Sequence, residues 1–111
     1  MPVSSSFQNL VLDLLAPIGP LPRRMFSGVG LFHTGVMFGL LVRDTLYFRV
    51  DATTRVRFEN AGSVPFSYTR SGRVVSLGGF YAVPEELMDR PDELLQWARD
   101  AVAVARAVRR R

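Results

Sequence analysis

The sequence contains no cysteine and only one histidine among its 111 residues. Without cysteine there is no disulfide and no thiolate metal site, which agrees with a reducing compartment. One imidazole ring is too little for a zinc site, because zinc needs several nitrogen or sulfur ligands. We therefore expect no metal site and no cofactor.

The sequence also lacks a long hydrophobic run and any repeated or low-complexity segment. No stretch approaches the roughly 20 apolar residues that cross a bilayer, and the N-terminus lacks the basic segment of a signal peptide. With 48% hydrophobic and 22% charged residues, the chain has a globular composition. We expect one domain over residues 1–111, cytoplasmic and without membrane contact.

Lysine is absent too, so the net charge of +4 comes from arginine alone. Up to Ala105 the basic and acidic residues balance, and the excess belongs to a short basic C-terminal tail, residues 106–111. Such a tail is typical of a solvated helix end that complements the helix dipole. Alternatively it makes weak, salt-sensitive contacts with DNA phosphates, through Arg106, Arg109, Arg110 and Arg111.

Few residues of this chain are candidates for a catalytic role. His33 is expected at the tip of a hairpin, as an exposed turn residue, and no two carboxylates converge in the pattern. Gly28-Val-Gly30 lies inside an expected strand and lacks the third glycine of a dinucleotide-binding loop. We predict no catalytic residue and no enzyme. A small enzyme would require a pocket in which His33 meets a carboxylate.

Residues 23–51 are predicted to form three consecutive antiparallel strands, around which the chain is organised. Turns at 34–35 and 43–44 would place Gly30 opposite Gly39 and Leu41 opposite Leu46. One face, the predicted core face, then carries Phe26, Gly28, Gly30, Phe32, Met37, Gly39, Leu41, Leu46, Phe48 and Val50.

The opposite face of this predicted sheet is also apolar, although a sheet covered on one side should alternate apolar with polar residues. Something must therefore cover it. Two candidates remain open, the C-terminal helix of the same chain and a second subunit. The candidate interface residues on this face are Val29, Leu31, Val36, Phe38, Leu40 and Tyr47.

Helices and a second hairpin are expected to flank the three strands. A helix over residues 5–16 would begin at a capping box of Ser5 with Gln8, and Asp51 would cap a second helix that ends before Gly62. A hairpin follows over residues 66–77, and Gly78-Gly79 is expected to end its second strand. A long helix completes an α+β fold.

Three motifs resemble the N-terminal domain of the TfoX/Sxy competence regulators. They are Arg-Met-Phe-Ser-Gly-Val-Gly-Leu-Phe (residues 24–32), Gly-Val-Met-Phe-Gly-Leu (35–40) and Leu-Tyr-Phe-Arg-Val-Asp (46–51). The likeness covers about residues 22–105, and the full-length regulators resemble this chain only in their first half. It implies a stand-alone N-terminal domain with a two-layer α-β3-α-β2-α fold and an antiparallel sheet, like secretion chaperones, which are usually dimers.

The resemblance also implies a role in transcriptional regulation, where the full-length proteins act with the cyclic-AMP receptor protein at competence promoters. The leading hypothesis is a non-enzymatic protein-interaction module that assists this regulation. Its partner would be a second copy, giving a homodimer, or another protein such as a transcription regulator. The alternative is an accessory DNA-binding protein that acts through the arginine-rich tail.

Overall fold

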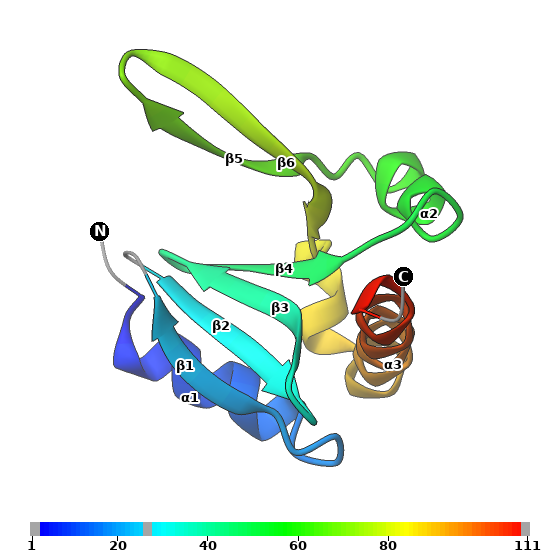
Figure 1. The fold of residues 1–111 in the computed structure, drawn as a ribbon. Helices are drawn as coiled ribbons and strands as arrows, with labels where there is room; N and C mark the ends of the chain where they lie inside the picture. Colours follow the sequence, from blue (N-terminus) through cyan, green and yellow to red (C-terminus); the bar gives the residue numbers. More distant parts are fainter. Residues whose placement is uncertain (1–2, 26–27, 110–111) are drawn as a thin grey trace.

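The structure is a computed structural model that describes residues 3–25 and 28–109. It confirms the expected α+β class, with three α-helices and a six-stranded antiparallel sheet among these residues (Figure 1). The elements in chain order are α1 (Ser5–Leu14), β1 (Leu21–Met25), β2 (Gly28–His33), β3 (Val36–Val42), β4 (Thr45–Arg49), α2 (Arg55–Asn60), β5 (Pro65–Arg70), β6 (Arg73–Ala82), the 3-10 helix η1 (Glu85–Asp89) and α3 (Pro91–Arg109).

Four strands precede α2, where the sequence predicted three. The expected first strand is two antiparallel strands, β1 and β2, with Met25 paired to Gly28. The apolar pattern of residues 23–32 hid this break, because Ser27-Gly28 is the only turn signal within it. The strand order in the sheet is β1-β2-β3-β4-β6-β5.

A β-bulge at Phe38 shifts the register between β2 and β3. Phe32 pairs with Met37 as predicted, but Leu31 pairs with Gly39, so β3 carries one extra residue there. The predicted pairing of Gly30 with Gly39 is therefore wrong. Because of the extra residue, Phe38 turns into the core, where it is fully buried with its ring centroid 6.3 Å from that of Phe48.

The core lies between one face of the sheet and the helices α1 and α3. The predicted face is correct for β4 and reversed for β2, because the bulge exchanges the two faces. Gly30 instead looks onto the outer face, where an added Cβ would meet Met25, Phe32 and Met37. Side chains of the core from the sheet and its ends include Val29, Leu31, Val36, Phe38, Leu41, Leu46, Phe48, Val50 and Tyr81, and those from the helices include Val11, Leu15, Phe58, Leu94, Ala98, Ala101, Val102 and Ala105.

Strand β6 continues through Gly78 and Gly79, which the sequence predicted would end it. It pairs with β5 up to Leu77 and, after a register shift, again at Tyr81, and it pairs with β4 from Phe80 onward. The two glycines therefore lie in the irregular stretch just before the pairing with β4 begins. The β5–β6 hairpin thereby leaves the plane of the main sheet and arches above it (Figure 1).

Side-chain hydrogen bonds hold the starts of α1 and α2, although the N-cap of α2 is Thr54, without a side-chain cap bond, and not Asp51 as predicted. The N-cap of α1 is Ser4 rather than Ser5, since its hydroxyl accepts a hydrogen bond from the Phe7 backbone N–H at 3.2 Å. Asp51 caps the turn that leads into α2, accepting from the backbone N–H groups of Thr53 and Thr54 at 3.0 and 2.8 Å. These bonds, chiefly that from Thr54, lower the pKa of Asp51. None of the helices described here is both long and apolar enough to span a membrane.

The Asp51 cap makes stability depend on pH. A carboxyl whose pKa is lower in the folded chain stabilises the fold above its unfolded-state pKa, and this contribution is lost as pH falls through the folded-state pKa. We expect Asp51→Ala to lower the free energy of unfolding by about 1 kcal/mol at pH 7. The difference from wild type should shrink below about pH 4. Urea unfolding at pH 7 and at acidic pH measures the difference in unfolding free energy between the two proteins. An equal difference at both pH values would contradict the stabilising role of the Asp51 carboxylate.

Gly28 is predicted to tolerate no side chain. A Cβ added there would lie 2.5 Å from the Leu41 carbonyl oxygen, a backbone atom that cannot move aside. We expect Gly28→Ala to cost roughly 1–3 kcal/mol of unfolding free energy. Gly78→Ala is the matched control, because no atom lies within 4 Å of its added Cβ. Equal midpoints in thermal unfolding for the two variants would show that the close approach at Gly28 is not a constraint.

Candidate interaction surface

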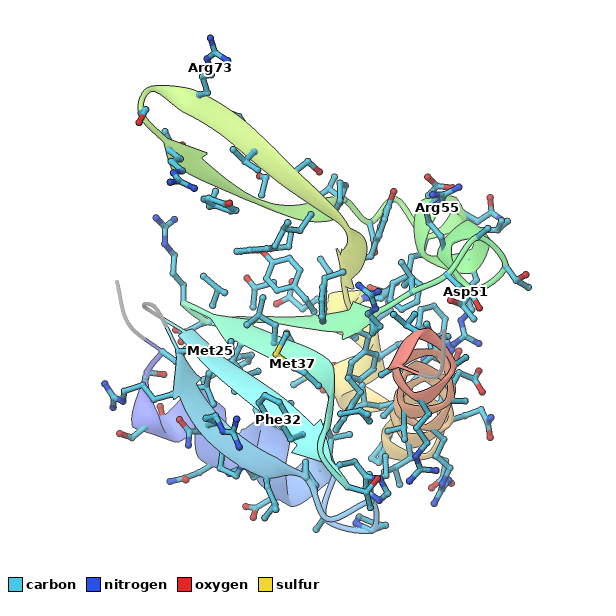
Figure 2. All side chains as sticks on the ribbon, viewed as in Figure 1. Met25, Phe32, Met37, Asp51, Arg55 and Arg73 are labelled. Carbon is cyan, nitrogen blue, oxygen red and sulfur yellow. The ribbon has the colours of Figure 1, made fainter. Side chains whose placement is uncertain are left out.

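The outer face of the main sheet forms the floor of a groove, and the β5–β6 hairpin forms its roof (Figure 2). The volume of this groove is about 910 Å³. Its floor comes from β1 to β4, with Met25, Gly28, Met37, Leu40, Val42, Arg43, Thr45 and Tyr47. Its roof and back come from the hairpin, with Phe66, Ser67, Tyr68, Thr69, Arg70, Val74, Leu77 and Phe80.

Aromatic contacts hold the hairpin over the floor. The Tyr47 and Phe66 rings meet edge to face with centroids 5.1 Å apart, and Phe66 stacks on Tyr68 at 6.1 Å. The Arg49 guanidinium lies 5.3 Å from the Phe80 ring centroid, at the bend of β6. Burial in this wall raises the pKa of Tyr47, against the opposing effect of Arg43. The back of the groove is therefore packed.

The hairpin exposes apolar side chains along its free length. Val74 is 75% exposed, Leu77 40% and Tyr68 39%, and all three also line the groove. Scattered apolar residues are ordinary on a protein surface, but a contiguous apolar patch is typical of a binding surface. The groove and the underside of the hairpin form such a patch.

The six candidate interface residues do not lie together. Val29, Leu31, Val36 and Phe38 are buried in the core against the chain's own helices and do not lie on the outer face. The bulge at Phe38 explains this, since it exchanges the faces on which the prediction depended. Leu40 and Tyr47 do lie on the outer face, where both line the groove. The cover over that face is the β5–β6 hairpin, and α3 packs on the other side.

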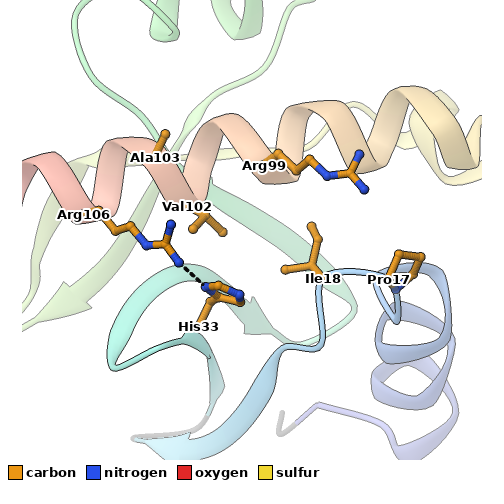
Figure 3. Close-up of a pocket in the computed structure, with 7 residues that line it drawn as sticks. All are labelled: Pro17, Ile18, His33, Arg99, Val102, Ala103 and Arg106. Atoms are coloured by element: carbon orange, nitrogen blue, oxygen red, sulfur yellow. Dashed lines mark hydrogen bonds between the residues drawn. The ribbon is translucent and has the colours of Figure 1, made fainter.

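A second, smaller hollow of about 300 Å³ lies between α3 and the end of the β2–β3 hairpin (Figure 3). Here Arg106 Nη2 lies 2.8 Å from His33 Nδ1 and 3.1 Å from Thr34 Oγ1. A guanidinium only donates, so Nδ1 is the acceptor in this contact. His33 is half-buried rather than an exposed tip, and its described partners include no carboxylate.

The predicted C-terminal tail is partly helical. Helix α3 extends to Arg109, and Arg106 is held by the hairpin end rather than free in solvent. Arg110 and Arg111 lie outside the described residues, as does the side chain of Arg109. Within the ranges that the structure describes, no group of three or more His, Asp or Glu side chains could hold a metal ion.

Comparison with known proteins finds two similarities. The family described as the TfoX N-terminal domain matches residues 13–105, which include the floor and the roof of the groove. The DNA transformation protein TfoX1 of Aliivibrio fischeri (strain ATCC 700601 / ES114) is 31% identical over 87 residues. This alignment covers 78% of the present chain and 41% of the relative, so the chain spans less than half of that relative's length.

The contact between Arg106 and His33 is predicted to fix the end of α3. Arg106→Ala should lower the free energy of unfolding by about 1–2 kcal/mol, since hydrogen bonds from a charged donor are lost. Arg99→Ala is the matched control, because Arg99 lines the same hollow on the same helix but is exposed. Hydrogen exchange in residues 102–109 should increase only in the Arg106 variant. Identical exchange in both variants would rule out this anchoring role.

Proposed function

This chain belongs to the family of TfoX N-terminal domains, and on that premise we propose that it is a non-enzymatic protein-interaction module in the regulation of DNA transformation. The observation that carries the proposal is the apolar groove under the β5–β6 hairpin. The link to transformation comes from the relative, whose name states that role. The interaction itself is argued from the surface of this chain.

The groove has the composition of a binding site. Grooves and pockets of roughly 300–1,000 Å³ that are mostly apolar, with a few polar groups at fixed positions, commonly accept a ligand. This groove has a comparable volume and combines an apolar floor with the Tyr47 hydroxyl and two arginines. Its roof is a two-stranded arm, and short two-stranded ribbons are only marginally stable alone. A partner that packs under the arm would therefore stabilise it.

Binding suits the described residues better than catalysis does. An enzyme would need a proton-transfer group placed in a cleft. His33, the one histidine, lies outside the groove and accepts its bond from Arg106. The case for DNA binding through the tail is also weaker, because Arg106 already donates hydrogen bonds to His33 and Thr34. The proposed regulator acts through protein contacts, made with a second copy or with another protein.

The proposal predicts that one hairpin residue is required in cells. Val74→Glu places a charge in the groove at an exposed position, so the fold should tolerate it. Val56→Glu is the matched control, since Val56 is 50% exposed on α2 and does not line the groove. Strains that lack the chain are complemented with each variant, and transcripts of the DNA-uptake genes are measured.

Wild type and the Val56 variant should restore transcript levels, while the Val74 variant should fail although it accumulates to the same level. Restoration by all three would exclude the groove as the functional surface. Transcript levels that do not respond to deletion of the chain would contradict the regulatory role.

A further inference from the structure

The charged residues of this chain are sorted between its two layers. None of the ten acidic residues lies in a strand, whereas the strands carry five arginines. The acids belong to the helices, to the β3–β4 turn and to the cap before α2. The sheet and its hairpin are therefore the basic side of the molecule, although the chain up to Ala105 is neutral.

Two arginines line the groove, one from a strand and one from the β3–β4 turn, where Asp44 follows it. Arg43 follows β3 and Arg70 ends β5, and these two turns lie at the same end of the groove (Figure 1). The described residues lining the groove include no Asp or Glu. The ion pairs found in the described part of the chain all involve other arginines, namely Arg55, Arg57 and Arg90. Arg43 and Arg70 thus lie beside an apolar floor without an ion pair among the described residues.

We propose that this groove binds a segment of another protein that carries apolar residues on one side and acidic residues beside them. This inference rests on the proposed function and names the chemistry of its partner. Apolar side chains would fill the space over Met37 and Leu40, while acidic side chains would meet Arg43 and Arg70. An amphipathic helix that lies in an apolar groove is a common mode of peptide recognition.

Charge disfavours a second copy of this chain as the occupant. A symmetric dimer formed groove to groove with the same ends superposed would bring Arg43 and Arg70 of both copies close together, and like charges oppose such a contact. The opposite orientation would offer these arginines no acidic residue among those described as lining the groove. Packing of one copy's helices into the next copy's groove would match the charges, but that contact is not self-complementary and continues into filaments unless the rotation closes a ring.

The ring contacts disfavour single-stranded nucleic acid. Bases bind by stacking on free aromatic faces. Here Tyr47, Phe66 and Tyr68 pack on each other, and Arg49 covers Phe80. The remaining floor consists of aliphatic and methionine side chains. Methionine adapts its shape to apolar side chains of different sizes, which suits a protein segment.

The test measures fluorescence anisotropy with three labelled probes on the full chain. The first is a synthetic amphipathic helix with leucine on one face and glutamate on the other, the second replaces every glutamate with lysine, and the third is a thymidine oligonucleotide. We expect the acidic peptide to bind at least about tenfold more tightly than the lysine peptide and to lose affinity as salt rises.

Charge reversal locates the binding site. Arg43→Glu combined with Arg70→Glu should weaken the acidic peptide by about tenfold or more. The matched control combines Arg55→Glu with Arg99→Glu, which changes the net charge equally but lies outside the groove. The control should bind as wild type does. Since all four residues are exposed, the variants should fold, and circular dichroism is the measurement that checks their folding.

Equal binding of the two peptides, equal weakening in both double variants, or tighter binding of the oligonucleotide would each overturn the inference. A dimer in light scattering whose dissociation accompanies peptide binding would replace it with self-association. If Val74→Glu fails in cells while the two peptides bind alike, the acidic partner is excluded and the proposed function stands. If wild type, Val74→Glu and Val56→Glu all restore the transcripts in cells, the proposed function is excluded instead.

Discussion

A sheet with apolar side chains on both faces has to be covered on both, and this requirement shapes the whole molecule. Helices α1 and α3 bury the inner face around Phe38 and Phe48. Among residues 3–25 and 28–109 no helix lies on the outer face, and its cover is the chain's own β5–β6 hairpin, which β6 directs upward at Gly78 and Gly79. The inner face is therefore part of a packed core, and the outer face is the floor of a groove lined by exposed apolar side chains.

The bulge at Phe38 shows which parts of the strand register can be predicted from the sequence of such a sheet. Strands β3 and β4 pair as predicted from their two-residue turn, because a short turn fixes the register. Between β2 and β3 a single extra residue exchanges the faces, and an apolar run that is hydrophobic on both sides gives no sign of it. Four of the six candidate interface residues were therefore placed on the wrong side.

The groove proposed as the interaction surface was predicted only in part, for a physical reason. Apolar excess on a second sheet face is visible in the sequence, and Leu40 and Tyr47 were found in this way. The roof was missed, because Gly78-Gly79 was taken as the end of a strand and not as a bend. A signal for the groove was present, however, in the strands that contain arginine but no acid. That signal becomes meaningful only once the topology places Arg70 of β5 at the same end of the groove as Arg43, which lies in the β3–β4 turn.

The central claim is that each chain covers its own outer face with its own hairpin. The direct measurement is a nuclear Overhauser effect between the Tyr47 and Phe66 rings, whose centroids are 5.1 Å apart. An equimolar mixture of isotope-labelled and unlabelled chains separates contacts within a chain from contacts between chains. The account predicts a Tyr47–Phe66 signal within single chains. No such signal, or one found only between labelled and unlabelled copies, would contradict it.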